Sequence, residues 1–245
     1  TDGAGSARIP ASCCGVLGLK PTLGRVPHPQ APDLFSNFTH IGLMTRTLPD
    51  LASMLNVLSG PHDGDPWSLG AQWEDVDVRP SVGARLRGTS AWYFPRMGNP
   101  RVASEVETLC VRAAQHLAET GVVVEDNAES LDWGIGVSRT IMRGLMSARM
   151  SQFDAKARAR MGPGMQAAIT QGEGMSAEAM KRAPLLRAQL YRMVQTLLAR
   201  HPLLLSPTLS APAPRADMDS VGELVVDGIN VGDLRSGWFT DPTPF

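Results

Sequence analysis

Residues 1–27 read TDGAGSARIPASCCGVLGLKPTLGRVP, a stretch in which small residues surround one hydroxyl, that of Ser6. Because such a segment has few bulky side chains, a ligand can approach its backbone N–H groups closely. A hydroxyl beside open N–H donors suits acyl transfer, in which the hydroxyl attacks a carbonyl and the donors stabilise the resulting oxyanion. A phosphate-binding turn or a tight structural loop would have the same composition, so the rest of the sequence has to decide.

The composition is that of a globular protein. The 245 residues suffice for one large or two small domains, with 43% hydrophobic and 19% charged residues. A net charge of −1 without a basic run argues against nucleic acid as a partner. No apolar run is long enough for a membrane span. Cys13, Cys14 and Cys110 lack the spacing of a disulfide framework or a metal site, so we expect reduced thiols, no metal and a cytoplasmic location.

Helix signals are clearest after residue 46. Thr47 can cap a helix in which Pro49 occupies the first turn and Asp50 follows the cap by three residues, and Gly60-Pro61 would end it. Farther along, residues 133–200 are predicted to be mostly helical, with breaks at 162–164 and 172–174. One apolar stripe in this region is formed by Leu186, Leu190, Met193 and Leu197.

Strand signals flank a second amphipathic helix. Residues 87–94 and 122–125 have strand character, and residues 101–120 between them have a helical period. This order predicts a βαβ unit and hence a mainly parallel sheet. The apolar face of the predicted helix comprises Val102, Val106, Leu109, Ala113 and Leu117. We expect further short buried strands within 15–19 and at 203–205, and a surface connection over 62–84.

The opening stretch resembles the amidase signature family of serine hydrolases. The family pattern is Asp-x-Gly-Gly-Ser-x-Arg-x-Pro-Ala, followed by Cys-Gly-x-x-Gly-x-Lys-Pro-Thr-x-Gly. Later blocks at 42–50, 60–66 and 203–207 extend the resemblance over most of the chain. The first blocks match at Asp2, Gly5, Ser6, Arg8, Pro10, Ala11, Cys14, Gly15, Gly18, Lys20, Pro21, Thr22 and Gly24.

The resemblance implies an α/β fold, with a mixed, mainly parallel sheet between helices on both sides, and a single amidase-type domain over 1–245. It implies hydrolysis of a carboxylic amide to an acid and ammonia or an amine, by a Ser–cis-Ser–Lys triad without cofactor or metal. Ser6 matches the nucleophile. The backbone N–H groups of Gly3, Ala4, Gly5 and Ser6 match the oxyanion hole, and Asp2 and Arg8 match residues that support the loop.

Ala4 stands where many family members have glycine, so it can keep its role only if its φ is not positive. The family's lysine base and cis-serine precede the nucleophile block. The resemblance therefore implies a central piece of a longer protein, without that upstream region and without the C-terminal end of the domain. Lys20 matches a structural position, and Lys156 and Lys181 lie among polar neighbours, where lysine is usually solvated.

The resemblance implies a small-molecule amide as the ligand, and an assembly that is either a homodimer or a complex with an amidotransferase partner. Two alternatives to the amidase are a subunit of an amidotransferase and a non-catalytic protein with the amidase fold. A Ser-His-Asp hydrolase is disfavoured because no Gly-x-Ser-x-Gly elbow accompanies the histidines. Cys14 is expected to be inert. The seven methionines from Met142 to Met180 are better explained by helix packing than by a substrate channel. Trp133 and Trp238 suit either a pocket or the core.

Overall fold

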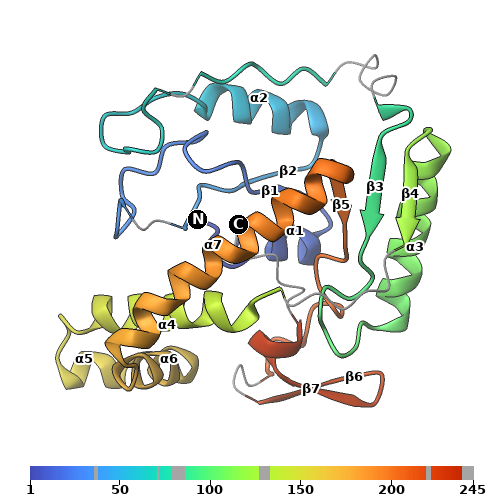
Figure 1. The fold of residues 1–245 in the computed structure, drawn as a ribbon. Coiled ribbons are helices and arrows are strands. Elements are labelled where there is room, and N and C mark those ends of the chain that lie inside the picture. Colours follow the sequence, from blue (N-terminus) through green and yellow to red (C-terminus); the bar gives the residue numbers. More distant parts are fainter. Residues whose placement is uncertain (36–37, 71, 79–85, 127–132, 219–221, 239–245) are drawn as a thin grey trace. The chain divides into compact units, whose positions relative to one another are not determined.

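The computed structural model describes residues 1–35, 38–70, 72–78, 86–126, 133–218 and 222–238 (Figure 1). The chain forms two compact units. The first comprises Thr1–Thr89 and Arg112–Val124, and the second comprises Ser90–Val111 and Glu125–Phe245. The boundary between the units falls within α3 (Ser104–Glu119) and β4 (Val123–Asp126). The single domain expected over 1–245 stays a prediction.

The first unit contains a short helix, α1 (Arg8–Cys14), an antiparallel strand pair and a longer helix, α2 (Leu48–Leu58). In the pair, β1 (Leu17–Leu19) faces β2 (Leu43–Thr45), with Gly18 opposite Met44. The apolar side of α2 packs on β2 through a cluster of buried residues, namely Val26, Leu43, Leu51 and Leu55. Through this cluster, β2 and α2 pack against Val26, which follows α1 and β1 in the chain.

The predicted limits of α2 are confirmed. The Thr47 hydroxyl oxygen accepts the Asp50 N–H at 3.3 Å, which caps the start of the helix. The same hydroxyl donates to Asp50 Oδ2 at 2.6 Å, so the two side chains hold each other in place. Pro49 lies in the first turn, where its missing N–H costs no helical hydrogen bond. The helix ends at Leu58, and Ser59 follows in an extended conformation.

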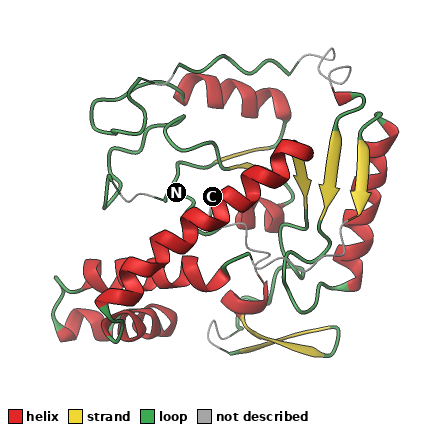
Figure 2. Cartoon of the chain, in the orientation of Figure 1, coloured by secondary structure: helices red, strands yellow, loops and turns green. Residues whose placement is uncertain are grey.

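The predicted βαβ unit is also present. The sheet has the order β4-β3-β5, in which β3 (Ser90–Tyr93) and β5 (Leu203–Leu205) run parallel with Trp92 opposite Leu204. The antiparallel pairs β1–β2 and β6–β7 form two further, separate sheets. The parallel pairing together with the helices confirms the expected α/β fold. Figure 2 shows these strands among the helices.

Each face of β3 has a helix against it. On one face, Trp92 and Phe94 pack against Val194 and Leu197 of α7 (Ala177–Arg200) in a cluster that includes Trp133. On the other face Tyr93 is buried, and its surroundings include Cys110 of α3. Burial is the largest cause that raises the pKa of Tyr93 to about 12, with smaller contributions from Cys110, Asp126 and Glu107.

Three helices accompany α7 in the predicted helical region: α4 (Ile135–Met150), α5 (Ala155–Ala159) and α6 (Pro163–Glu173). The break at 162–164 is the start of α6, because Gly162 precedes the helix and Pro163 opens it. The stripe predicted on α7 is half-buried, as are all seven methionines from Met142 to Met180. A side chain at Gly144 would collide with Met180, which shows that α4 and α7 pack closely there. Trp133 and Trp238 are both buried.

A hairpin of β6 (Glu223–Val226) and β7 (Ile229–Asp233) leads into the helical turn η2 (Leu234–Trp238). At its tip, Asp227 accepts hydrogen bonds from Arg101 Nη2 at 2.6 Å and from the Ser104 N–H at 2.9 Å. The Ser104 hydroxyl donates to the same oxygen at 2.7 Å, so the hairpin caps the N-terminus of α3.

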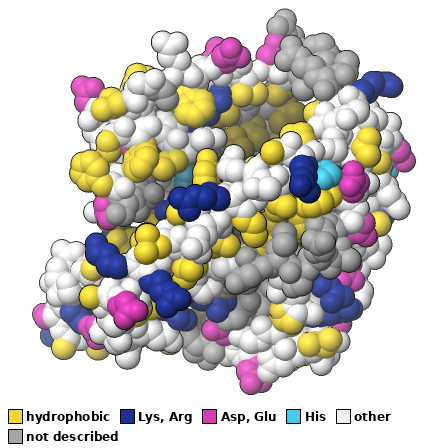
Figure 3. Space-filling model, viewed as in Figure 1, with side chains coloured by type: hydrophobic (Ala, Val, Ile, Leu, Met, Phe, Trp, Pro, Cys, Tyr) yellow, Lys and Arg dark blue, Asp and Glu magenta, His cyan; other side chains and the backbone are white. Residues whose placement is uncertain are grey.

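Several expectations about burial were wrong. Leu17 of β1 and Leu109 of α3 are 38% and 60% exposed, and β5 is half-buried throughout. Val106 and Leu117 of the predicted face are half-buried, but Cys110 and Ala114 are half-buried in place of Leu109 and Ala113. The surface connection contains two buried residues, Asp65 and Ser68, and its residues 71 and 79–84 lie outside the described residues. In the view of Figure 3, hydrophobic side chains reach the surface at several places. No helix among those described is long and apolar enough to cross a bilayer.

Candidate active site

Ser6 lies in the turn that leads into α1, within the first unit. The helical hydrogen-bonding pattern starts beside it, because the Ile9 N–H donates to the Gly5 carbonyl oxygen at 2.7 Å. The Ser6 side chain is exposed, and its hydroxyl has no hydrogen-bond partner among the described residues. It is therefore open to a ligand.

Asp2 organises the turn around Ser6. Its carboxylate is fully buried and accepts four hydrogen bonds. Two come from backbone N–H groups, that of Gly5 to Oδ1 at 2.6 Å and that of Ala7 to Oδ2 at 3.2 Å. Two come from the Arg8 guanidinium, with Nη2 donating to Oδ1 and Nε to Oδ2, each at 3.0 Å. The donors on either side of Ser6 are thus held by a single side chain.

The electrostatic balance at Asp2 favours the ionised carboxylate. Burial alone would raise the pKa of Asp2. The hydrogen bonds and charge of Arg8, together with the N–H groups of Gly5 and Ala7, outweigh burial and lower this pKa from 3.8 to about 2. A charged Asp2 near neutral pH keeps the turn in a fixed shape.

The turn is also fixed to a distant segment of the chain. The Asp2 N–H donates to the His40 carbonyl at 2.7 Å, and the His40 N–H donates to the Asp2 carbonyl at 2.9 Å. Beyond this bridge, a Cβ at Gly42 would collide with the Ala7 side chain and approach the Asp2 Cβ to 3.5 Å. Close backbone approach therefore requires glycine at 42. Sequence reasoning did not identify His40 or Gly42 as neighbours of Ser6, because a long-range pairing leaves no local signal.

The four N–H groups expected to form the oxyanion hole are not equivalent. That of Gly5 is donated to Asp2, and Gly5 has φ +97°, a conformation that favours glycine. Those of Gly3, Ala4 and Ser6 make no hydrogen bond within the part of the chain that the structure describes. Ala4 does not have a positive φ, so the condition for its replacing glycine is met.

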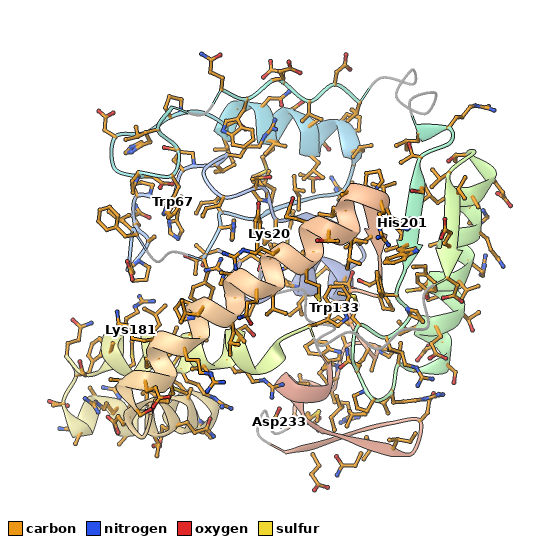
Figure 4. The ribbon with its side chains drawn as sticks, viewed as in Figure 1. Lys20, Trp67, Trp133, Lys181, His201 and Asp233 are labelled. Atoms are coloured by element: carbon orange, nitrogen blue, oxygen red, sulfur yellow. The ribbon has the colours of Figure 1, made fainter. Side chains whose placement is uncertain are left out.

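The lysines and histidines that sequence reasoning set aside are either exposed or take part in other interactions. Lys20 Nζ donates to the Pro21 carbonyl at 3.3 Å, and Lys156 and Lys181 are exposed (Figure 4 labels Lys20 and Lys181). His116 pairs with Glu119 on α3. His201, which is labelled in Figure 4, stacks on Trp92 at 4.2 Å between ring centroids. The described residues contain no group of three His, Cys, Asp or Glu placed to hold a metal ion.

Comparison with known proteins identifies the family of the chain. The family model described as Amidase matches residues 1–231. An acylamidase of Rhodococcus erythropolis is 30% identical over 216 residues, which are 86% of this chain and 44% of that protein. A glutamyl-tRNA(Gln) amidotransferase subunit of Staphylococcus aureus is 32% identical over 155 residues, covering 63% of this chain and 32% of that subunit.

Solved structures of amidase signature enzymes also match the chain. A bacterial aryl acylamidase of the amidase signature family superimposes with a TM-score of 0.82 and 26% identity, over 99% of this chain and 52% of that one. A 6-aminohexanoate cyclic dimer hydrolase has the same fold, with a TM-score of 0.72 and 20% identity over 98% of this chain and 50% of its own. The chain thus spans about half the length, or less, of the relatives that it matches. Because the family model matches residues 1–231, the chain belongs to the amidase family.

Proposed function

We propose that the protein hydrolyses carboxylic amides through an acyl-enzyme on Ser6. The observation that carries the proposal is the open Ser6 hydroxyl in a turn fixed by Asp2 and Arg8, where the N–H groups of Gly3, Ala4 and Ser6 are unbonded among the described residues. A nucleophile beside preorganised donors is the arrangement that acyl transfer needs, and each donor lowers the barrier by about 3 kcal/mol. Membership of the amidase family supports the same chemistry.

In the proposed reaction, Ser6 Oγ attacks the amide carbonyl carbon while the N–H groups of Gly3, Ala4 and Ser6 bind the developing oxyanion. Collapse of the tetrahedral intermediate breaks the C–N bond and releases the amine, which takes up a proton. Water then hydrolyses the ester on Ser6 and releases the acid. The Gly5 N–H donates to Asp2, so Gly5 helps to fix the shape of the turn and is not a fourth oxyanion donor.

The proton of Ser6 needs an acceptor, since a serine without a base is a weak nucleophile at neutral pH. We propose that this acceptor is the lysine and cis-serine pair that the family resemblance implies before Thr1. We therefore propose the activity for a polypeptide that contains such a pair together with residues 1–245. N-acylated arylamines are the first substrates to test, because an acylamidase and an aryl acylamidase are among the relatives. A homodimeric assembly and a cytoplasmic location remain predictions.

The test is covalent labelling of the polypeptide that includes the upstream region. A fluorophosphonate should modify Ser6, as located by peptide mapping, and a competing anilide should slow the modification. Ser12 provides a matched control, because it is an exposed serine of the adjacent helix. Ser12→Ala should label normally and Ser6→Ala should not. Labelling that persists in Ser6→Ala contradicts the proposal, because another residue then reacts. A native polypeptide that is never labelled contradicts it too and favours a non-catalytic amidase-fold protein.

A second candidate follows from the similarity to the amidotransferase subunit of Staphylococcus aureus. In that case Ser6 would release ammonia from an amide donor for use by a partner protein. Amide hydrolysis that depends on Ser6 but appears only with a co-purified second protein would favour this function. Full activity of the isolated polypeptide on anilides would favour the acylamidase.

A further inference from the structure

The C-terminal end of α1 carries two thiols that the proposed reaction does not use. Cys13 and Cys14 are the last two residues of the helix, both are exposed, and neither is in a disulfide. Gly15 ends the helix with φ +65°, and a Cβ there would meet no atom within 4 Å. Both thiols are therefore exposed at a helix end, and the space around Gly15 is open.

Cys14 contributes to the electrostatic environment of Cys13. The pKa of the Cys13 thiol is raised, first by partial burial and then by the neighbouring Cys14 sulfur. A thiol with a raised pKa stays protonated near neutral pH, which slows oxidation and alkylation because both proceed through the thiolate. Cys13 is thus kept in the thiol form.

Direct closure to a disulfide is disfavoured by the helix. Successive helical residues are rotated by about 100°, so their side chains diverge. A disulfide needs its two Cβ atoms about 3.5–4.5 Å apart and its sulfurs about 2.05 Å apart, which would unwind the last turn. A bridging atom bonded to both sulfurs tolerates a wider separation, because it adds a second bond between them.

We infer that Cys13 and Cys14 form a vicinal dithiol site for trivalent arsenicals, which are soft centres that bond two thiolate sulfurs. The probe is phenylarsine oxide. Its arsenic forms one bond to each sulfur, and the two S–H protons leave with the arsenic-bound oxygen as water. Arsenic stays trivalent and both sulfurs keep their oxidation state, so no oxidant or reductant is required.

Cys110 is the matched control. It is a single, half-buried thiol on α3, and burial raises its pKa. A single thiol can form only one bond to the arsenical, and excess glutathione competes with one bond far better than with a two-bond chelate. The dithiol should keep its arsenical in glutathione and lose it only to a dithiol such as 2,3-dimercaptopropanol.

The experiment measures the intact mass of the purified protein after phenylarsine oxide and then excess glutathione. We expect one adduct on the native protein and on Cys110→Ser, and at least a tenfold loss of affinity in Cys13→Ser and in Cys14→Ser. Alkylation mapping of the native protein needs no variant and should show both Cys13 and Cys14 protected by the arsenical, with Cys110 still alkylated. An adduct that survives in Cys13→Ser, or alkylation of Cys13 and Cys14 unaffected by the arsenical, would overturn the inference.

Discussion

Asp2 and Arg8 form a two-point ion pair at the turn that presents Ser6, with both carboxylate oxygens 3.0 Å from guanidinium nitrogens. The Asp2 side chain is fully buried, whereas that of Arg8 keeps 22% of its surface exposed. A buried carboxylate is tolerated only when its hydrogen-bonding capacity is filled. The pair therefore makes the shape of the turn depend on one charge.

Replacing Asp2 by asparagine should lower the free energy of unfolding by about 2–4 kcal/mol, because Arg8 would lose its partner and the new amide N–H would face backbone donors. Urea denaturation measures the change. Asp217→Asn is the matched control, since Asp217 forms a similar two-point pair with Arg215 at the surface. We expect that variant to change stability by less than about 1 kcal/mol. Equal effects of the two substitutions would show that burial of the Asp2 pair is unimportant.

The same pair predicts an acid-dependent loss of stability. The pKa of Asp2 is about 2 in the folded chain, against 3.8 without the interactions of the turn. A lowered folded pKa contributes stability above pH 3.8, and the contribution disappears as the pH falls toward 2. The stability difference between native protein and Asp2→Asn should therefore shrink by about 2 kcal/mol between about pH 5 and pH 2. A pH-independent difference would mean that Asp2 does not titrate in this range.

Ser6→Ala should abolish amide hydrolysis without lowering the stability of the fold. The Ser6 side chain is exposed and its hydroxyl makes no hydrogen bond among the described residues, so the free energy of unfolding should change by less than about 0.5 kcal/mol. Amide hydrolysis by the polypeptide that includes the upstream region should fall more than about 10³-fold, because the nucleophile is gone. Anilide kinetics and thermal unfolding on the same samples check both. Retained turnover would remove Ser6 from the mechanism.

Gly42→Ala should disturb the turn that presents Ser6, because residue 42 packs against Ala7 of that turn. The new methyl group would collide with the Ala7 side chain, so we expect a loss of about 1–3 kcal/mol in the free energy of unfolding. Gly136→Ala in α4 is the control, because a Cβ there meets no atom within 4 Å and alanine favours a helix. That variant should be neutral or more stable. A Gly42→Ala protein as stable as Gly136→Ala would show that the two segments can move apart.

Local signals predicted part of the fold well. The start of α2 was predictable because Thr47, Pro49 and Asp50 act on one another within a few residues. The order strand, helix, strand also appeared as expected over β3, α3 and β4. Burial was predicted less well. The apolar face of α3 was placed on Leu109 and Ala113, but the half-buried face contains Cys110 and Ala114, because the neighbours of a helix decide which of two adjacent stripes is covered.

The candidate site was also predictable only in part. The residue types of the first eight positions, and their resemblance to the amidase signature pattern, were sufficient to nominate Ser6 and its small neighbours. The sequence did not distinguish among the four expected oxyanion donors, whereas in the structure the Gly5 N–H donates a hydrogen bond to Asp2. The positive φ of Gly5 and the absence of one at Ala4 were likewise set by the folded turn.

The sequence by itself determined the amidase family, the nucleophile candidate and the helix that follows residue 47, because these depend on residue identity and on interactions between near neighbours. Only the tertiary structure decided what surrounds Ser6. The bridge between Asp2 and His40 and the fit of Gly42 against Ala7 join segments far apart along the chain. Such contacts form only when the free energy gained by packing exceeds the entropy lost in closing the intervening loop, and no local pattern records that balance.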